Sequence, residues 1–257
     1  MNPAVPSWWG VGASVVLVAL TVLLVVREGL GLSREVLIAS ARAIVQLVAV
    51  GALLGVLFDH AGLPGALAWV VAMVLVGGGV AGRRGAGVPG AQGIATIAIG
   101  SGTAVTLGLL VVAQVIDVHP RVLVPVGGMV VSAATRGTSV ALLRMAEEAV
   151  TGRRQIEARL ALGLPGAVAF APHRRSALRA ALVTDIDAVR TVGLISLPGA
   201  MTGLLLAGVD PLTAIRYQVV VMWMILAAVT VAAAVAGRLA VGRLFDSAQR
   251  LLVTGGS

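Results

Sequence analysis

Four polar side chains lie within long apolar runs of the sequence. Arg42 and Gln46 are four residues apart, so a helix places them on one face. Arg136 and Gln218 each stand in a later apolar run. Polar groups in hydrocarbon are costly unless they are paired or functional. These four residues are therefore candidates for lining a solute pathway, although Arg42 is near the end of its run and can instead extend its guanidinium to the membrane surface.

A charged cluster begins another apolar run. Asp185, Asp187 and Arg190 fall within six residues of one another, between the apolar side chains that precede and follow them. One interpretation is an interfacial ion-pair cluster that needs no further role. The other is a set of proton-relay groups, as used by ATP-independent carriers.

The run that follows this cluster is interrupted near its middle. Pro198 and Gly199 are poor helix residues, and Pro198 also disfavours helical backbone at the residue before it. We expect a helix break here, with Gly203 in the same segment, and such a break either lines a cavity or is a plain packing kink. Close helix packing is also predicted from the GxxxG pairs Gly51/Gly55, Gly78/Gly82 and Gly199/Gly203.

The sequence offers no catalytic constellation. It contains no cysteine, which excludes disulfides and thiolate chemistry, and its histidines at 60, 119 and 173 are isolated, so no metal site is identified. All 19 basic residues are arginine. A phosphate-binding P-loop requires a lysine, so we expect that this chain hydrolyses no ATP and is not an enzyme.

The composition is that of an integral membrane protein. Of 257 residues, 58% are apolar and 12% are charged, and the mean hydropathy is +1.02. A soluble domain of this size needs a larger charged surface. The net charge of +8 does not indicate a nucleic-acid partner, because the arginines are scattered between apolar runs and only one Tyr and three Phe are present.

The expected fold class is all-α, a polytopic bundle of about seven transmembrane helices forming a single domain over residues 1–257. Helices satisfy their own backbone groups in lipid, and no barrel-like alternation is present. The predicted spans are Trp9–Val26, Val36–Phe58, Leu63–Ala81, Ala91–Ile116, Val122–Leu143, Val183–Val209 and Thr213–Ala236.

The arginines gather in alternate connections between these spans. The other connections are short and carry acids, such as Asp117 and Asp210. By the positive-inside rule we expect a multi-pass protein of the inner (plasma) membrane, with its N-terminus outside and its C-terminus in the cytoplasm.

One long cytoplasmic loop, 144–182, separates the fifth and sixth predicted spans. Its helical period places Met145, Ala149, Ile156 and Leu160 on one face, and Gly163 followed by proline marks a stop. The loop is amphipathic, which suits either helices lying on the membrane surface or a docking surface for a cytoplasmic partner. Two i,i+4 pairs are expected on its polar side, Arg144/Glu148 and Arg153/Glu157.

Two stretches of the chain carry a family resemblance. Residues 157–163, Glu-Ala-Arg-Leu-Ala-Leu-Gly, resemble the EAA-x-x-x-G loop of ABC-transporter permeases. The stretch 190–208, followed by Asp210-Pro211 and Tyr217-Gln218, is similar to the FetB/YbbM family of iron-export ABC permeases, to which plant aluminium-tolerance proteins also belong. Arg42, Gln46-Leu47 and Gly128-Met129 match as well, whereas the Gly-Asn pair expected shortly afterwards is replaced by Val130-Val131-Ser132.

The resemblance implies a permease subunit of an ABC transporter that exports iron or another metal. Two copies would join two separate cytoplasmic ATPase subunits, which would bind the ATP and Mg²⁺. It places the ATPase contact in loop 144–182, at Arg153, Arg154, Glu157, Ala158 and Gly163. Two alternatives stay open: an ABC permease for a small polar molecule such as a nucleotide sugar, and an ATP-independent carrier or channel.

Overall fold

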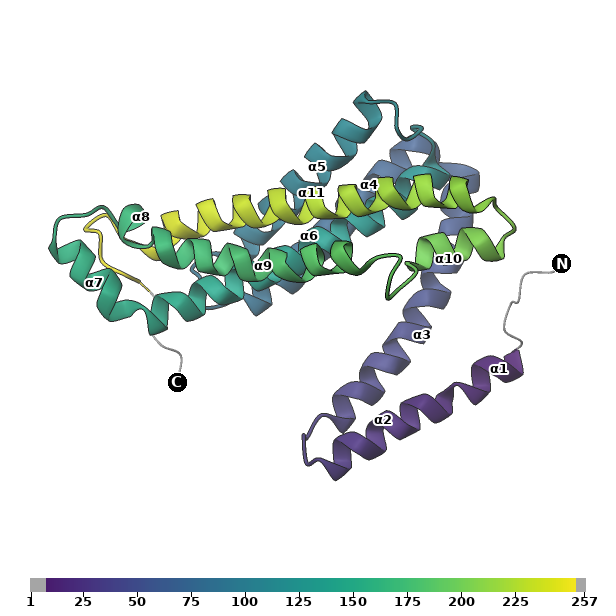
Figure 1. Ribbon diagram of the computed structural model, residues 1–257, viewed down its shortest axis with the longest axis horizontal. Helices are drawn as coiled ribbons and strands as arrows, with labels where there is room; N and C mark the ends of the chain where they lie inside the picture. The colour runs from purple at the N-terminus through teal and green to yellow at the C-terminus, as the bar shows by residue number, and fades with distance from the viewer. Residues whose placement is uncertain (1–7, 253–257) are drawn as a thin grey trace.

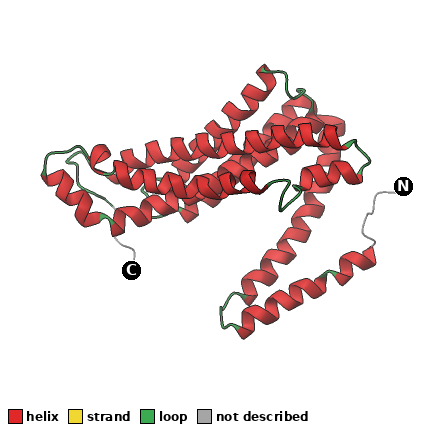
Figure 2. Ribbon diagram, in the orientation of Figure 1, coloured by secondary structure: helices red, strands yellow, loops and turns green. Residues whose placement is uncertain are grey.

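A computed structural model describes residues 8–252, and its regular elements are helices (Figure 2). They are α1 (Trp8–Ala13), α2 (Val15–Arg27), α3 (Ser33–Val56), the π-helical turn η1 (Leu57–Ala61), α4 (Gly62–Arg84), α5 (Ala91–Val112), α6 (Pro120–Thr151), α7 (Arg153–Ala161), α8 (Gly166–Ala169), α9 (Ala171–Thr191), α10 (Gly199–Leu206) and α11 (Pro211–Leu244). The all-helical prediction is confirmed.

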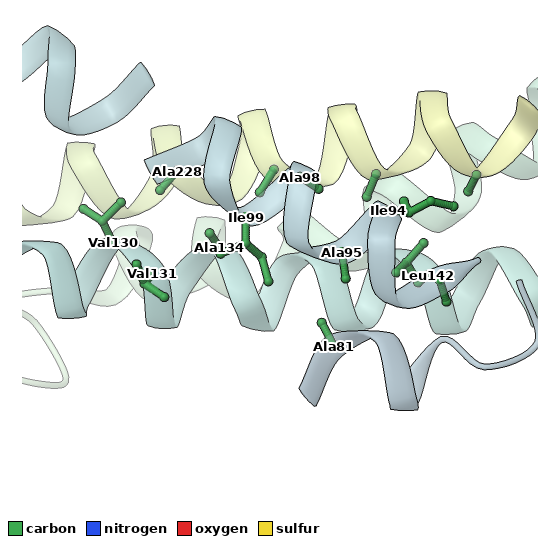
Figure 3. Close-up of a cluster of buried hydrophobic side chains, with 14 of the residues drawn as sticks. Ala81, Ile94, Ala95, Ala98, Ile99, Val130, Val131, Ala134, Leu142 and Ala228 are labelled. Carbon is green, nitrogen blue, oxygen red and sulfur yellow. The ribbon is translucent and has the colours of Figure 1, made fainter. Parts of the chain in front are cut away.

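Four long helices, α4, α5, α6 and α11, pack on one another, and α9 lies against α6 and α11 (Figure 1). Their shared core is built largely from small side chains, among them the fully buried Ala95, Ala98, Ala134 and Ala228 (Figure 3). Small residues allow helix backbones to approach closely, which is the main source of packing energy between helices in lipid. This bundle is the rigid frame against which the polar groups are held.

The predicted GxxxG pair on α4 makes a close helix contact. A Cβ added to Gly82 would lie 2.5 Å from Cα of Gln92 on α5, and one added to Gly78 would overlap Thr96. Backbone of α5 therefore approaches α4 at both glycines, as the spacing predicts. The other two pairs, on α3 and α10, have nothing within 4 Å of their positions among the described residues.

Six helical segments are long and apolar enough to cross a membrane. They correspond to six of the seven predicted spans, and the chain is a multi-pass membrane protein. The remaining prediction, Val183–Val209, is not one helix: α9 ends at Thr191 and α10 begins at Gly199. Both pieces pack against α11 in succession, so together they run along its length as a discontinuous segment (Figure 1).

The helices on either side of loop 144–182 extend beyond the predicted bounds of the fifth and sixth spans. Helix α6 does not stop at Leu143 but continues to Thr151, and α9 begins at Ala171 and runs without a break into the sixth segment. Met145 and Ala149 are fully buried, which explains the extension, because their apolar face stays in the bundle core. The independent part of the loop is residues 152–170, which we call the coupling elbow.

The first helices stand apart from this bundle. Helices α2 and α3 pack on each other, and α3 reaches the rest of the chain through η1 (Figure 1). No residue of α2 is buried. The hairpin therefore presents apolar side chains on all sides, which suits contact with lipid or with another protein chain.

Arginine-bearing helix ends gather at one end of the bundle. The α4–α5 turn packs on the last part of α6, since Cβ atoms added to Gly85 and Gly87 would meet Leu142 and Ala146. The end of α11 reaches the same region, where Phe245 packs on Gly166 of α8. The grouping of these ends agrees with the grouping of arginines read from the sequence.

Candidate functional site

An ion pair joins α6 and α9 within the bundle. Nη2 of Arg136 lies 3.6 Å from Oδ1 of Asp185, and Nη1 of Arg136 donates a hydrogen bond of 3.1 Å to Oγ of Ser132. Arg136 is near the middle of the 32-residue α6, so the pair lies far from either end of that helix. The Asp185 side chain is mostly enclosed, at 15% exposure. The Arg136 side chain is 56% exposed, so the pair joins an open guanidinium to an enclosed carboxylate.

The three charged residues predicted as a cluster do not act together. Asp185 turns toward α6, whereas Asp187 pairs with Arg190 at 3.1 Å on the exposed side of α9. Neighbouring residues two apart on a helix point in nearly opposite directions, which separates the two acids. Arg190 lies in the last turn of α9, where a cation interacts favourably with the helix dipole.

The predicted helix break is present over residues 192–198. The backbone of Val192 turns extended, and Gly193 has a φ of +78°, a left-handed conformation that glycine tolerates best. The N–H of Gly193 donates to the carbonyl of Ser196 at 2.9 Å, closing a tight turn. Pro198 caps α10 and Gly199 opens it, whereas Gly203 lies inside α10 rather than in the break.

A hollow of about 370 Å³ lies beside the break, against α11. Gln218 of α11 lines it and is buried, with 5% of its surface exposed. Its Oε1 is enclosed and has no hydrogen-bond partner in the described part of the chain. Gln218 is thus an interior side chain, and its part in a solute pathway stays a prediction.

Arg42 and Gln46 lie elsewhere. They share one face of α3, as their spacing predicts, around a shallow hollow of about 290 Å³ with Ala41 and Val45. Both are exposed, and within residues 8–252 neither has a hydrogen bond or an ion pair. Helix α3 packs on α2 and η1, not on α6 or α9. Within one copy of the chain, these residues are therefore not brought together with Arg136.

The coupling elbow presents its predicted contact residues outward. In α7, Arg153 pairs with Glu157 at 2.7 Å, as expected from their spacing. Both are about half exposed, and Arg154, Ala158 and Gly163 are exposed too. Gly163 has a φ of +82° directly after α7 ends, so it serves as the expected stop. This face of the elbow is exposed in the single chain.

The inner side of the elbow is anchored to the bundle. Ile156 and Phe170 are fully buried, and Nη1 of Arg159 donates to the carbonyl of Ala169 at 3.1 Å. The other predicted pair of the loop is wrong: Arg144 binds Glu147 at 2.8 Å, and Glu148 instead contacts His173 of α9 at 2.7 Å. Glu148 points to the buried side of α6, which Arg144 does not reach.

A feature that the sequence analysis missed is the C-terminal hook, residues 245–252. The backbone N–H of Gly166 in α8 donates to Oε1 of Gln249 at 2.6 Å, and Asp246 pairs with Arg250 at 2.7 Å. The backbone N–H of Arg250, and then its side chain, lower the pKa of Asp246 below its ordinary value. The hook and the elbow enclose a hollow of about 750 Å³. No sequence motif predicts this contact, because Gln249 and Gly166 are far apart in the chain.

Metal-ligating side chains do not gather anywhere in the described residues. No group of three or more His, Cys, Asp or Glu side chains lies close enough to hold an ion. Arg136 and Asp185 form an ion pair and Gln218 supplies a single amide, and neither arrangement is a metal coordination sphere.

Comparison with known proteins covers nearly the whole chain. The chain is 40% identical over 239 residues to the UPF0014 membrane protein STAR2 of Oryza sativa subsp. japonica, covering 90% of this chain and 84% of that protein. It is 32% identical over 243 residues to the "Probable iron export permease protein FetB" of Escherichia coli, covering 94% and 93%. It is 34% identical over 239 residues to the protein ALUMINUM SENSITIVE 3 of Arabidopsis thaliana, covering 93% and 88%.

No solved structure matches the chain. The family model described as "Uncharacterised protein family (UPF0014)" matches residues 8–245, which include every helix from α1 to α11. The similarity to FetB and to the plant proteins expected from the 190–218 stretch is thereby confirmed. This multi-pass membrane chain belongs to the UPF0014 family.

Proposed function

We propose that this chain is the membrane-spanning permease subunit of an ATP-binding-cassette transporter that exports iron or another metal from the cytoplasm. The supporting observation is the continuity of α9. Its first turn is held beside the coupling elbow, where His173 pairs with Glu148 at the end of α6 and lies against Gly152, and its last turns carry Asp185 and lead into the helix break. A movement at the elbow is therefore transmitted directly to the polar groups within the bundle.

The ATPase is a separate chain in this proposal. The printed sequence has no lysine and so no P-loop, and ATP and Mg²⁺ would be bound by the partner. The partner would dock on the exposed face of the elbow at Arg153, Arg154, Glu157, Ala158 and Gly163, which are accessible. ATP-driven closure of two such partners would tilt the elbow and switch access to the pathway.

A homodimer completes the proposed pathway. Arg42 and Gln46 lie on the α2–α3 hairpin, which has few contacts with its own bundle. An intramembrane arginine needs a polar surrounding, and a second copy of the chain can supply it. The conduit would then be lined by Arg42 and Gln46 of the hairpin, together with Arg136 and Gln218.

The proposed orientation places the elbow in the cytoplasm. The ends of α4, α6 and α11 that carry arginines share the elbow's end of the bundle, which supports a cytoplasmic C-terminus by the positive-inside rule. The discontinuous α9–α10 segment gives an odd number of crossings and so an external N-terminus. The membrane would be the inner (plasma) membrane.

The most specific part of the proposal is the export of iron, which rests on the similarity to FetB, a probable iron export permease. The test is purification of the tagged chain from native membranes in mild detergent, followed by ATP-dependent uptake of radioactive iron into inverted vesicles. Co-purification of a P-loop ATPase near one-to-one, with iron uptake, supports the proposal. A homo-oligomer without an ATPase favours an ATP-independent carrier. ATP-driven transport of a nucleotide sugar, without transport of iron, would identify the nucleotide sugar as the substrate.

A further inference from the structure

The hollow beside the helix break holds a buried amide without a partner. Gln218 is 5% exposed, and neither Oε1 nor Nε2 of its side chain forms a hydrogen bond within residues 8–252. Buried polar side chains in folded proteins nearly always have partners, and an exception calls for an explanation. A bound solute that supplies the missing hydrogen bonds is one such explanation.

The backbone around the hollow is a second source of groups that can bind a solute. The break leaves the end of α9 and the start of α10 facing each other across residues 192–198. Helix ends carry backbone groups without intrahelical partners, and broken membrane helices use such groups to hold solutes. The remaining lining is apolar, including Met201 of α10 and Val219 and Met222 of α11.

We propose that this hollow is a substrate subsite, in which the amide of Gln218 hydrogen-bonds a polar group of the transported solute. The inference rests on the proposed transport function and locates one part of its pathway. An amide can serve as donor through Nε2 or as acceptor through Oε1. The subsite is therefore not restricted to one kind of polar group.

The lining also decides the chemical class of the ligand. Iron and other divalent ions take several carboxylate, imidazole or water ligands, and the lining of this hollow includes one amide and no carboxylate or imidazole. A bare cation is thus excluded from this subsite. The ligand is a small organic solute, or a metal already enclosed by an organic chelator, with apolar surface against Met201 and Met222.

The absence of cysteine from the sequence gives a direct test of solvent access. Met222→Cys places a single thiol in the hollow, and Trp223→Cys places one on the next residue of α11, which is 65% exposed on the outside of the bundle and faces lipid in the proposed membrane. Maleimides react with thiolates, which form in water and not in hydrocarbon. We expect N-ethylmaleimide to label Met222→Cys at least tenfold faster than Trp223→Cys; equal rates overturn the subsite.

The second arm tests recognition by the amide. Gln218→Met keeps the side-chain length and removes hydrogen bonding, whereas Gln92→Met makes the same change at an exposed position of α5 outside this hollow and should transport at the wild-type rate. We expect Gln218→Met to reach the membrane with its ATPase partner and to lose at least tenfold of ATP-dependent iron uptake in inverted vesicles, with the iron supplied as its citrate complex. Uptake at the wild-type rate overturns the inference. If Gln218→Met fails to insert, Gln218→Asn, which shortens the reach of the amide, replaces it with the same expected loss.

Failure of the proposed function would give different results from failure of the subsite. A wild-type chain that binds no ATPase or moves no iron contradicts the transporter assignment, and the labelling arm still decides whether the hollow is open to water. A wild type that exports iron beside a fully active Gln218→Met variant leaves the transporter intact and removes the subsite.

Discussion

Nδ1 of His173 and Oε2 of Glu148 lie 2.7 Å apart, joining the first turn of α9 to the last turns of α6. Gly152, where α6 gives way to α7, lies against the same imidazole ring. Three segments therefore meet where the elbow leaves the bundle. The contact therefore joins the elbow to both α6 and α9.

Gly152→Ala should loosen this junction. A Cβ at this position would overlap the His173 ring and lie 2.7 Å from the Glu148 carbonyl oxygen, so the ring must move. Overpacking of this kind costs about 1–3 kcal/mol. We expect a lower melting temperature in detergent and weaker ATPase co-purification. Gly242→Ala is the matched control, because nothing lies within 4 Å of its Cβ position in the described residues; equal effects from both variants would contradict the role of the junction.

Glu157→Ala should uncouple transport without unfolding the protein. The Arg153–Glu157 pair is about half exposed, and surface pairs of this type contribute about 0.5 kcal/mol or less. We expect unchanged membrane insertion and melting temperature with a large loss of ATP-dependent transport. Gly163→Pro should act similarly, because it changes the backbone at the end of α7.

Glu147→Ala is the control for Glu157→Ala. It removes a similar exposed pair, with Arg144 at 2.8 Å, from α6 rather than from the elbow. Normal ATPase docking and transport in Glu157→Ala would show that the partner does not bind this face.

Arg136 and Asp185 should show strong coupling in a double-mutant cycle. Arg136→Gln leaves Asp185 enclosed without its cation, and Asp185→Asn leaves an arginine unpaired at membrane depth. We expect each single variant to lose about 1–3 kcal/mol of stability, and the double variant to be less damaged than the sum. Thermal unfolding in detergent measures this directly.

Arg190→Gln gives the comparison for that cycle, because its pair with Asp187 is exposed on both sides. Its effect on stability should be within about 0.5 kcal/mol. Additive losses for Arg136 and Asp185 would mean that the 3.6 Å contact carries no energy.

Gln249→Ala and Asp246→Asn should release the C-terminal hook. The first removes the acceptor for the Gly166 N–H, and the second weakens the contact with Arg250. Hydrogen–deuterium exchange over residues 245–252 should become faster in both variants. Unchanged exchange in Gln249→Ala would mean that the Gly166–Gln249 hydrogen bond does not hold the hook.

The hook should also respond to acid in a defined direction. The pKa of Asp246 is lowered in the folded chain, so its carboxylate stabilises the hook fully above the ordinary aspartate pKa. That contribution is lost as the pH falls through the lowered folded value. We therefore expect the protection factors of the hook amides, which are corrected for the intrinsic pH dependence of exchange, to be constant near neutrality and to fall in strong acid, and the Asp246→Asn variant to lack this acid transition.

The sequence predicted the helices well because bilayer length and apolar content leave few alternatives. It did not predict where α6 ends, since hydropathy falls near Leu143 while the apolar face continues through Met145 and Ala149. Pro198 and Gly199 predicted the break, because the backbone preferences of single residues can be read directly from the sequence. Its extent back to Val192 depends on Gly193, one of 33 glycines in the chain.

The pairing of polar residues was not predictable to the same degree. Neighbours along a helix, such as Arg153 and Glu157, follow from spacing alone. Arg136 and Asp185 meet only because α6 and α9 pack in one register, which buried alanines and glycines determine collectively. Glu148 illustrates the limit: spacing along the sequence favoured Arg144, whereas the packing of α9 on α6 places His173 against Glu148 instead.

Helix α9 behaves mechanically as a lever arm. Its 21 residues form one rod from Ala171 to Thr191, with His173 in the first turn and Asp185 toward the far end, and without proline after the first turn. Such a rod is about 31 Å long, and a tilt of about 5° at one end displaces the other by about 3 Å. A displacement of that size is comparable to the diameter of a water molecule, so a slight rotation at the elbow suffices to open or close a single-file gap at the far end.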